Sequence, residues 1–222
     1  GSEEYPIIIT KYEEGAPLSN IYTQLNIHDI KFILKDLLLC LQAVHSRQVV
    51  HQDITLYNIL YSPELHQATL IDWGCGSFVV ENRMSPFNGS RLYRSPEMLI
   101  GYQNYSTKAD MWAVGVVILL MITRGKFPWE AMNADKELVA MSTIFGGDTL
   151  IQYSNEVLHQ QIKPKLLPDF TPNITAKIED FYAEESKDIQ DPSLIDLMNH
   201  LLTLDFNERY TAEQALQHPF LQ

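Results

Sequence analysis

Cysteine and basic residues are scarce in this chain of 222 residues, and each scarcity excludes some compartments or binding partners. Only two cysteines occur, Cys40 and Cys75, and Cys40 lies in an apolar helical stretch that predicts a buried free thiol. This usage favours a reducing intracellular compartment, cytoplasmic or nuclear. Lysine and arginine number 16 against 28 acidic residues, giving a formal net charge of -12. Because nucleic acids and membrane surfaces bind clustered cations, we expect neither as a partner.

Long apolar runs are also missing. The most apolar stretch, residues 111–122, has about half of the ~20 residues that a membrane span needs. It predicts instead a helix that is buried on all sides, with a core built around it. The composition, with 45% hydrophobic and 20% charged residues, is that of an ordinary globular protein. The length suffices for one substantial domain.

Hydrophobic periodicity predicts a mainly helical chain. Apolar residues spaced three and four apart indicate an amphipathic helix over 27–46, which Asn26 can cap with Asp29 three positions on. Residues 146–190 carry few periodic signals and predict an irregular stretch. Further helices are expected over 110–123, 135–145, 193–203 and 211–217.

The strand signals are few and short. Residues 5–10 (YPIIIT) are apolar and β-branched, which predicts a strand. Residues 58–61 and 69–71 flank a turn at 62–64 and predict a hairpin-like pair. Residues 74–95 are rich in Gly, Ser, Pro and Asn, and long loops of this kind in compact domains are usually functional.

Three oxygen-bearing side chains lie close to the predicted hairpin. Asp53 and Asn58 flank a tight loop, and Asp72 ends the strand just beyond it. Two carboxylates and an amide that converge on one cleft make a hard-oxygen site suited to Mg²⁺, which in turn suits a polyphosphate. A separate carboxylate can then orient a hydroxyl group for attack.

Four patterns follow one another along the chain: HQDITLYN at 51–58, DWG at 72–74, SPE at 95–97, and DMW at 110–112 with Arg209 near the end. In this order, with the closing NERYTAEQALQHPFL, they resemble the catalytic loop, the metal-binding motif and the activation-segment end of protein kinases. Each tripeptide alone is weak, but the ordered set is specific and covers essentially all of residues 5–221. DWG and GSRLYRSPEML resemble casein kinase II, whereas NILYSPELHQATLIDWG, ADMWAVGVVILL and STIFGG resemble cell-division-cycle-seven-type kinases.

The resemblance implies a role for each matching residue. Asp53 is expected to be the catalytic base or hydroxyl-orienting carboxylate, and Asn58 and Asp72 to hold Mg²⁺ beneath ATP. A solvated loop acid at Asp53 and a simple turn cap at Asp72 are the alternatives. The hinge backbone that faces adenine would be Lys11, Tyr12 and Glu13, after Thr10 at the gatekeeper position.

Four further residues are expected to be structural. The resemblance implies a buried ion pair between Glu97 and Arg209. It also implies that Asp110 holds the catalytic-loop backbone from the buried helix, with a plain helix cap as the alternative. His51 is expected to be a packed histidine rather than a proton carrier.

Three positions depart from the kinase pattern. Thr55 occupies the place where Ser/Thr kinases usually have a lysine that meets the γ-phosphate, and losing one such charge typically costs about 10²–10³ in rate. Gln52 replaces the arginine that receives an activation-loop phosphate in many kinases, so we expect no phospho-switch through it. Trp73 replaces phenylalanine and predicts a metal motif held in one state.

The small lobe of a kinase has no counterpart in this sequence. A kinase needs a Gly-rich loop, a strand lysine and a helix glutamate, all of which precede the hinge. We expect a tag scar and disordered lead at 1–4, the last small-lobe strand and hinge at 5–17, and a mainly α large (C-terminal) lobe at 18–222. The chain alone is then expected to be inactive, with a partner chain or a second copy on the exposed small-lobe face.

Residues 82–95 are basic in an otherwise acidic chain, with Arg83, Arg91 and Arg94 and no acid. Arg91 and Arg94 fall where casein kinase II-like enzymes place residues that read acidic substrates, which predicts an acidic Ser/Thr protein as substrate or partner. The alternative is that both arginines bind loop carbonyls. Three functions stay open: an active Ser/Thr kinase, a pseudokinase-type binding scaffold, and a vestigial truncated gene product.

Overall fold

The computed structural model describes residues 11–81 and 83–222. The strand expected at 5–10 and the gatekeeper position Thr10 lie outside these residues. The described part is mainly helical with a few short strands, as the sequence predicts. None of its helices is both long enough and apolar enough to cross a bilayer.

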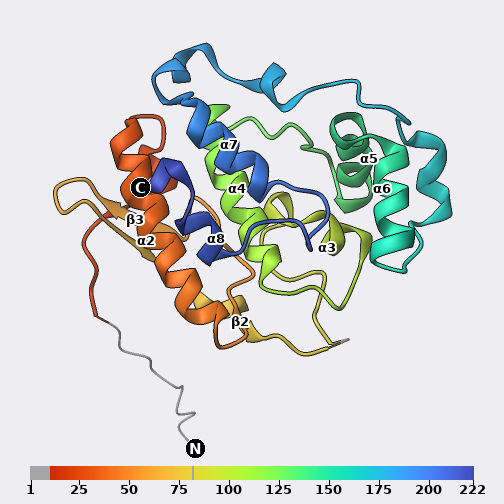
Figure 1. The fold of residues 1–222 in the computed structure, drawn as a ribbon, viewed down its shortest axis with the longest axis horizontal. Helices are drawn as coiled ribbons and strands as arrows, with labels where there is room; N and C mark the ends of the chain where they lie inside the picture. The colour runs from red at the N-terminus through yellow and green to blue at the C-terminus, as the bar shows by residue number, and fades with distance from the viewer. Residues whose placement is uncertain (1–10, 82) are drawn as a thin grey trace, which may run out of the picture.

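Helix α4 (Lys108–Ile122) is the centre of the core, and every residue from Ala109 to Ile122 is buried. A helix without a polar face must be covered on all sides by other elements. Helix α7 (Pro192–Leu201) packs against it (Figure 1). Gly115 makes this approach possible, because a Cβ atom there would lie 2.8 Å from Leu202 Cδ2.

Helix α2 (Ile27–His45) forms where its cap and its apolar stripe predict it. The Asn26 side chain accepts hydrogen bonds from the backbone N–H groups of His28 and Asp29, at 2.8 and 3.1 Å. The Asp29 carboxylate accepts one in return from Asn26 N, which completes a capping box. Helix α8 (Ala212–Leu216) packs on α2. The buried stripe of α2 consists of Ile30, Ile33, Leu34, Leu37, Leu38 and Leu41.

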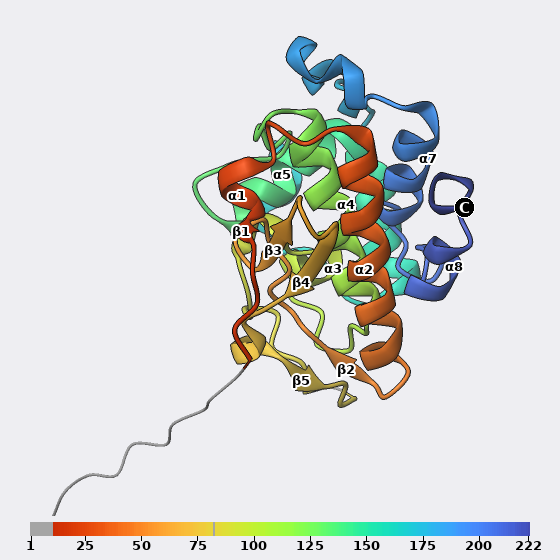
Figure 2. The same ribbon diagram turned by 90° about the vertical axis from the view of Figure 1, so that its left-hand side faces the viewer.

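The described residues form two small antiparallel sheets. Strands β3 (Ile59–Ser62) and β4 (Gln67–Leu70) form a hairpin, and β1 (Ala16–Pro17) pairs with the free edge of β3. Figure 2 shows the hairpin between β1 and α2, which packs on β4. Strands β2 (Val49–Val50) and β5 (Ser77–Phe78) form the second sheet. In the hairpin Ile59 faces Leu70, so the residues just outside this pair meet at the base of the hairpin.

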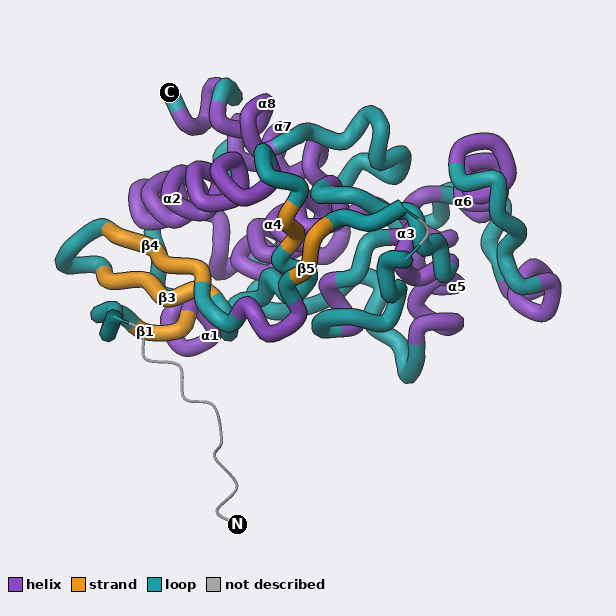
Figure 3. Tube along the Cα trace, turned by 90° about the horizontal axis from the view of Figure 1, so that it is seen from below, coloured by secondary structure: helices purple, strands orange, loops and turns teal. Residues whose placement is uncertain are grey.

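Helices α5 and α6 lie at the opposite end of the molecule from the hairpin, as Figure 3 shows, whereas α1 packs beside β1 and β3. The stretch expected to be irregular does contain one helix, α6, followed by the π-helical turn Tyr153–Val157 and several 3₁₀ turns. Short helix α1 begins directly after β1, and α3 begins after the long loop. Their bounds are Leu18–Ile21 for α1, Pro96–Ile100 for α3, Ala134–Phe145 for α5 and Gly147–Gln152 for α6.

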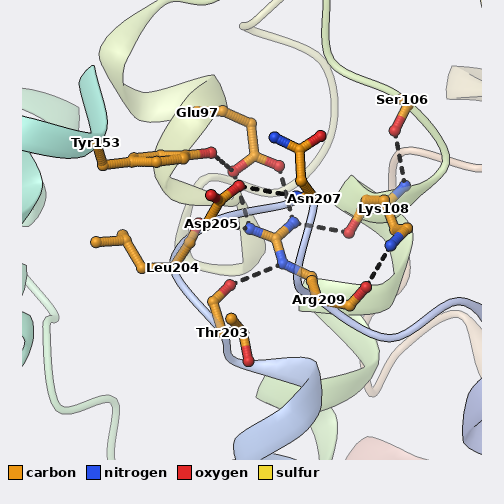
Figure 4. Close-up of polar contacts among 9 residues, drawn as sticks. All are labelled: Glu97, Ser106, Lys108, Tyr153, Thr203, Leu204, Asp205, Asn207 and Arg209. Carbon is orange, nitrogen blue, oxygen red and sulfur yellow. Dashed lines mark hydrogen bonds and ion pairs between the residues drawn. The ribbon is translucent and has the colours of Figure 1, made fainter. Parts of the chain in front are cut away.

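A buried ion pair joins α3 to the C-terminal part of the chain. Arg209 Nη1 lies 2.8 Å from Glu97 Oε1, Arg209 Nη2 lies 3.0 Å from Glu97 Oε2, and both residues are 0% exposed (Figure 4). The guanidinium also lies 5.1 Å from the centre of the Trp112 ring. Because both charges lose hydration, such a pair fixes an arrangement more than it adds net stability. The guanidinium group of Arg209 also donates hydrogen bonds to the backbone carbonyls of Thr203, Leu204 and Lys108.

Candidate functional site

The base of the β3–β4 hairpin brings loop 51–58 and Asp72 to one edge. Ile71 N donates to Asn58 O at 2.9 Å, directly beyond the last paired residues of the hairpin. A ring nitrogen of His51, Nε2, lies 3.0 Å from Ile71 O. Since both polar backbone groups of Ile71 bind loop 51–58, the next residue, Asp72, leaves the strand beside that loop.

Asp53 and Asn58 hold each other within the loop. Asn58 Nδ2 donates to the backbone carbonyl of Asp53 at 2.8 Å and to its Oδ2 at 3.1 Å. Ser90 N, from the long loop, donates to Asp53 Oδ1 at 2.7 Å. The half-buried Asp53 carboxylate is therefore oriented from two sides, which a freely solvated loop acid would not be.

Asp72 lies in the left-handed region, with φ 60° and ψ 73°. Its Oδ1 accepts a hydrogen bond from Gly74 N at 3.2 Å, so it does cap the following turn, while the side chain remains exposed. A non-glycine residue in this conformation costs on the order of 1–3 kcal/mol and is typical of functional sites. Trp73 closes the turn by packing edge-on against the His51 ring, with the ring centres 4.6 Å apart.

The carboxylate of Asp110 ties the loop to the core helix. Asp110 is 1% exposed. Its two oxygens accept hydrogen bonds from His51 N and Gln52 N, each at 2.9 Å, and Oδ2 also lies 2.8 Å from His45 Nε2. The N-cap of α4 is Thr107 rather than Asp110. Asp110 thus acts on the loop backbone and not as a plain helix cap.

His51 is fully buried, and both of its ring nitrogens face the backbone. Nδ1 accepts a hydrogen bond from Asp53 N at 3.2 Å, and Nε2 donates to Ile71 O. The ring therefore positions the two segments that carry Asp53 and Asp72.

Gln52 joins loop 51–58 to the long loop through neutral hydrogen bonds. It is almost fully buried and has φ 68°. Its Nε2 donates to Ser77 Oγ, and its Oε1 accepts from Asn88 Nδ2 and from Tyr105 Oη. At the position where the family pattern has an arginine, this amide network holds the loop without a phosphate group.

Thr55 is part of the loop interior. It is 2% exposed, and its Oγ1 accepts hydrogen bonds from Tyr57 N at 3.2 Å and Asn58 N at 3.3 Å. The hydroxyl group therefore shapes the turn that carries Asn58. It supplies no counterpart of the positive charge that a lysine would bring.

Arg91 and Arg94 both bind groups of the chain itself. Arg91 donates to Ala131 O at 2.9 Å and forms an ion pair with the buried carboxylate of Glu137, whose pKa is raised by that burial. Arg94 donates to the carbonyls of Asn88 and Gly89, at 3.1 and 2.9 Å, and burial lowers its pKa. The Arg91 side chain remains 34% exposed. Substrate recognition by either arginine stays a prediction.

Residues 11–17, where the hinge is expected, lead into the sheet, and in the described part of the chain no hydrogen bond or ion pair joins them to Asp53 or Asn58. Lys11 Nζ lies 3.1 Å from Glu13 Oε1, and Tyr12 is 83% exposed. Gly15, with φ 139°, lets this segment pass close to β3, since a Cβ atom there would lie 2.9 Å from Tyr61 O. The expected contact of Lys11, Tyr12 and Glu13 with adenine stays a prediction.

Sequence reasoning missed Gly89 and Ser90, which help to position Asp53. Gly89 has φ 69°, and a Cβ atom there would lie 1.9 Å from the carbonyl oxygen of Gln52. This close approach brings Ser90 N to the Asp53 carboxylate. The signal in the sequence is the run Asn88-Gly89-Ser90, which is a turn signature within the long loop.

A group of metal-ligand residue types also gathers away from this site, where Asp196, His200 and His218 approach one another. His218 Nε2 lies 3.0 Å from Asp196 Oδ2, and its Nδ1 accepts a hydrogen bond from Phe220 N at 3.3 Å. A metal ion on His218 would have to displace one of these bonds. These hydrogen bonds explain the cluster structurally, because His218 caps the 3₁₀ turn Pro219–Leu221 at the C-terminus.

The model of the protein kinase domain family matches residues 2–221. This chain belongs to the protein kinase family. The match includes loop 51–58, Asp72 and the Glu97–Arg209 pair, which are the parts that the ordered motifs singled out. The mainly helical fold of the described residues agrees with a kinase-like chain.

Replacing Gly89 with alanine is expected to displace Ser90 from Asp53 in this kinase domain, because the added methyl group would overlap the Gln52 carbonyl. Amide hydrogen exchange measures the effect, and the Ser90 amide should lose its protection. Gly101→Ala is the matched control: Gly101 also has positive φ, 94°, but its Cβ atom would meet only Gln160 Nε2 at 3.5 Å. An unchanged Ser90 amide in Gly89→Ala, or an equal loss in Gly101→Ala, would contradict the prediction.

Proposed function

We propose that this chain is the large-lobe part of a Ser/Thr kinase that transfers the γ-phosphoryl group of ATP to acidic protein substrates. The observation that supports this most is the preorganised carboxylate of Asp53, which Ser90 N and Asn58 Nδ2 orient at the edge where Asp72 emerges. Positioned groups of this kind supply most of the catalysis in phosphoryl transfer. Likeness to casein kinase II and cell-division-cycle-seven-type motifs favours serine and threonine as acceptors.

Asn58 and Asp72 would hold Mg²⁺, and their chemistry fits it. Asn58 is turned so that its Nδ2 binds Asp53, which leaves its carboxamide oxygen as the ligand atom. Asp72 is an exposed carboxylate with one oxygen on Gly74 N. Both offer the hard oxygen atoms that Mg²⁺ prefers. When bound, Mg²⁺ neutralises charge on the phosphates.

Asp53 would orient the substrate hydroxyl group. As the hydroxyl oxygen bonds to the γ-phosphorus and ADP leaves, the hydroxyl proton passes to an Asp53 carboxylate oxygen. A positioned general base contributes typically 10²–10⁴-fold to a rate. Asp110 and His51 keep this carboxylate in place through the loop backbone and do not act on the substrate.

A pseudokinase-type scaffold is the second candidate function, and Thr55 is the observation that favours it. A buried hydroxyl group bonded to two amides replaces the charge that would meet the γ-phosphate. Exposed aromatic side chains offer a surface for a partner chain or a second copy. They are Tyr12, Tyr57 and Phe78, which are 83%, 69% and 68% exposed.

Asp53→Asn is expected to lower kcat for an acidic serine peptide by about 10²–10⁴, because the amide cannot accept the proton. The assay is Mg-ATP turnover by the full-length protein. The 222-residue chain alone should show none. Glu213→Gln, an exposed acid on α8, is the control and should match the wild type. Full activity in Asp53→Asn would refute the proposed role, and a wild type without turnover would favour the scaffold.

The double variant Arg91→Gln with Glu137→Gln tests how acidic substrates are recognised. Neutralising both partners avoids leaving the buried Glu137 charge unpaired, which would itself destabilise the fold. We expect the ratio of kcat/KM between acidic and neutral peptides to fall about tenfold, because charge-assisted bonds to Arg91 are lost. Arg83→Gln, an exposed arginine of the same loop, is the control. An unchanged ratio in the double variant would show that Arg91 does not recognise acidic substrates.

A further inference from the structure

A pocket of about 290 Å³ lies between loop 51–58, the end of the long loop and the turn that follows α4. Its size lies at the lower limit of the cavities that enclose whole small ligands, which are typically about 300–1,000 Å³. One amino-acid side chain is therefore the occupant that suits it. Six of the residues around it matter here: Tyr22, Leu56, Tyr57, Tyr93, Leu120 and Phe127.

The walls of this pocket are held by contacts between segments that are distant in the sequence. Leu56 N donates to Tyr93 Oη at 3.4 Å, and the Tyr93 and Phe127 rings pack edge to face with centres 5.5 Å apart. Gly125 lets Tyr22 approach, since a Cβ atom at Gly125 would lie 2.6 Å from Tyr22 Oη. Burial raises the pKa of Tyr93 to about 12. The pocket is thus preformed.

Two short chain paths connect the pocket to Asp53. Leu56 follows Asp53 by three residues, and Tyr93 follows Ser90, which is bonded to Asp53, also by three. At no more than about 3.6 Å per residue, the first path places the backbone of Leu56, which lines the pocket, within about 11 Å of the backbone of Asp53, and the second places Tyr93 within the same distance of Ser90. An extended peptide advances about 3.3 Å per residue. The pocket can therefore receive a side chain up to about three residues from the phosphorylated hydroxyl group.

The chemistry of the lining selects the kind of side chain. The described residues that line the pocket include no charged side chain, although the whole sequence has 28 acids. A lysine or arginine side chain would lose hydration here and gain no partner. Leucine and aromatic surfaces with tyrosine hydroxyl groups suit an aromatic or long aliphatic side chain instead.

We propose that this pocket is a specificity site, which binds one aromatic or long aliphatic side chain of the substrate polypeptide within about three residues of the acceptor hydroxyl. The proposal rests on the proposed kinase function and adds an apolar requirement to the acidic one. Tyr57 is the residue through which it can be tested, because it lines the pocket and is 69% exposed, so that its replacement leaves the core intact.

The experiment uses the natural protein that contains this chain and a set of acidic serine peptides. Phe, Leu, Ala or Arg occupies each of the four positions on either side of the serine in turn. At one position within three residues of the serine, kcat/KM should be about tenfold higher for Phe and Leu than for Ala, as burial of such a side chain allows. Arg there should not exceed Ala.

Tyr57→Glu should remove most of the Phe advantage and raise the rate with Arg at the same position, because an acid then lines the pocket. Leu65→Glu is the matched control, an exposed apolar residue (56%) in the turn at the far end of the hairpin, and should change neither rate. Equal rates for Phe and Ala at every position, or an unchanged preference in Tyr57→Glu, would overturn the pocket assignment.

The experiment distinguishes a wrong pocket assignment from a wrong functional proposal. If no peptide is phosphorylated, the proposed kinase activity is refuted, and equilibrium binding of the same peptides, by fluorescence polarisation, then tests the pocket alone. A Phe peptide that binds about tenfold more tightly than its Ala counterpart, with the difference lost in Tyr57→Glu, supports the pocket. Equal binding of the two peptides overturns it.

Discussion

Asp110 is buried at 1% exposure within the first turn of an apolar helix, where an ionised carboxylate needs partners. It finds them in the N–H groups of His51 and Gln52 and in the ring of His45. This arrangement carries the rigidity of the core into the loop that holds Asp53 and Asn58. The position of Asp72 follows from it, because His51 in turn binds the backbone beside Asp72. The geometry of the whole site therefore depends on one buried carboxylate.

Two residues that depart from the kinase pattern, Gln52 and Thr55, make well-defined hydrogen bonds. Gln52 replaces a charged residue and binds Ser77, Asn88 and Tyr105 through neutral hydrogen bonds, and Thr55 shapes its own turn. These contacts order the loops around Asp53 without a phosphate group. A site held in this way is consistent with an enzyme that needs no activating phosphate, and equally with a scaffold that keeps a fixed surface. Turnover with Mg-ATP distinguishes the two, since both share the same loop geometry.

Local signals in the sequence predicted much of the fold. The Asn26–Asp29 capping box and the apolar stripe determine α2, and the uniformly apolar run determines the buried α4. Strands of two residues, such as β2 and β5, exist through pairing alone and leave no periodic signal. For the site, Asp53, Asn58 and Asp72 could be selected as an ordered set, whereas the partner of Arg91 could not. Glu137 lies 46 residues further along the chain, and only the packing of α5 brings it there.

Native-state hydrogen exchange of the His51 and Gln52 amides measures the bond to Asp110 most directly. If Asp110 fixes the loop, both amides exchange only through global unfolding, with the same opening free energy as the amides in the middle of α4. In Asp110→Asn their protection should fall well below that of α4. Local exchange of the two amides in the wild type, or equal protection in Asp110→Asn, would contradict the central role of this carboxylate.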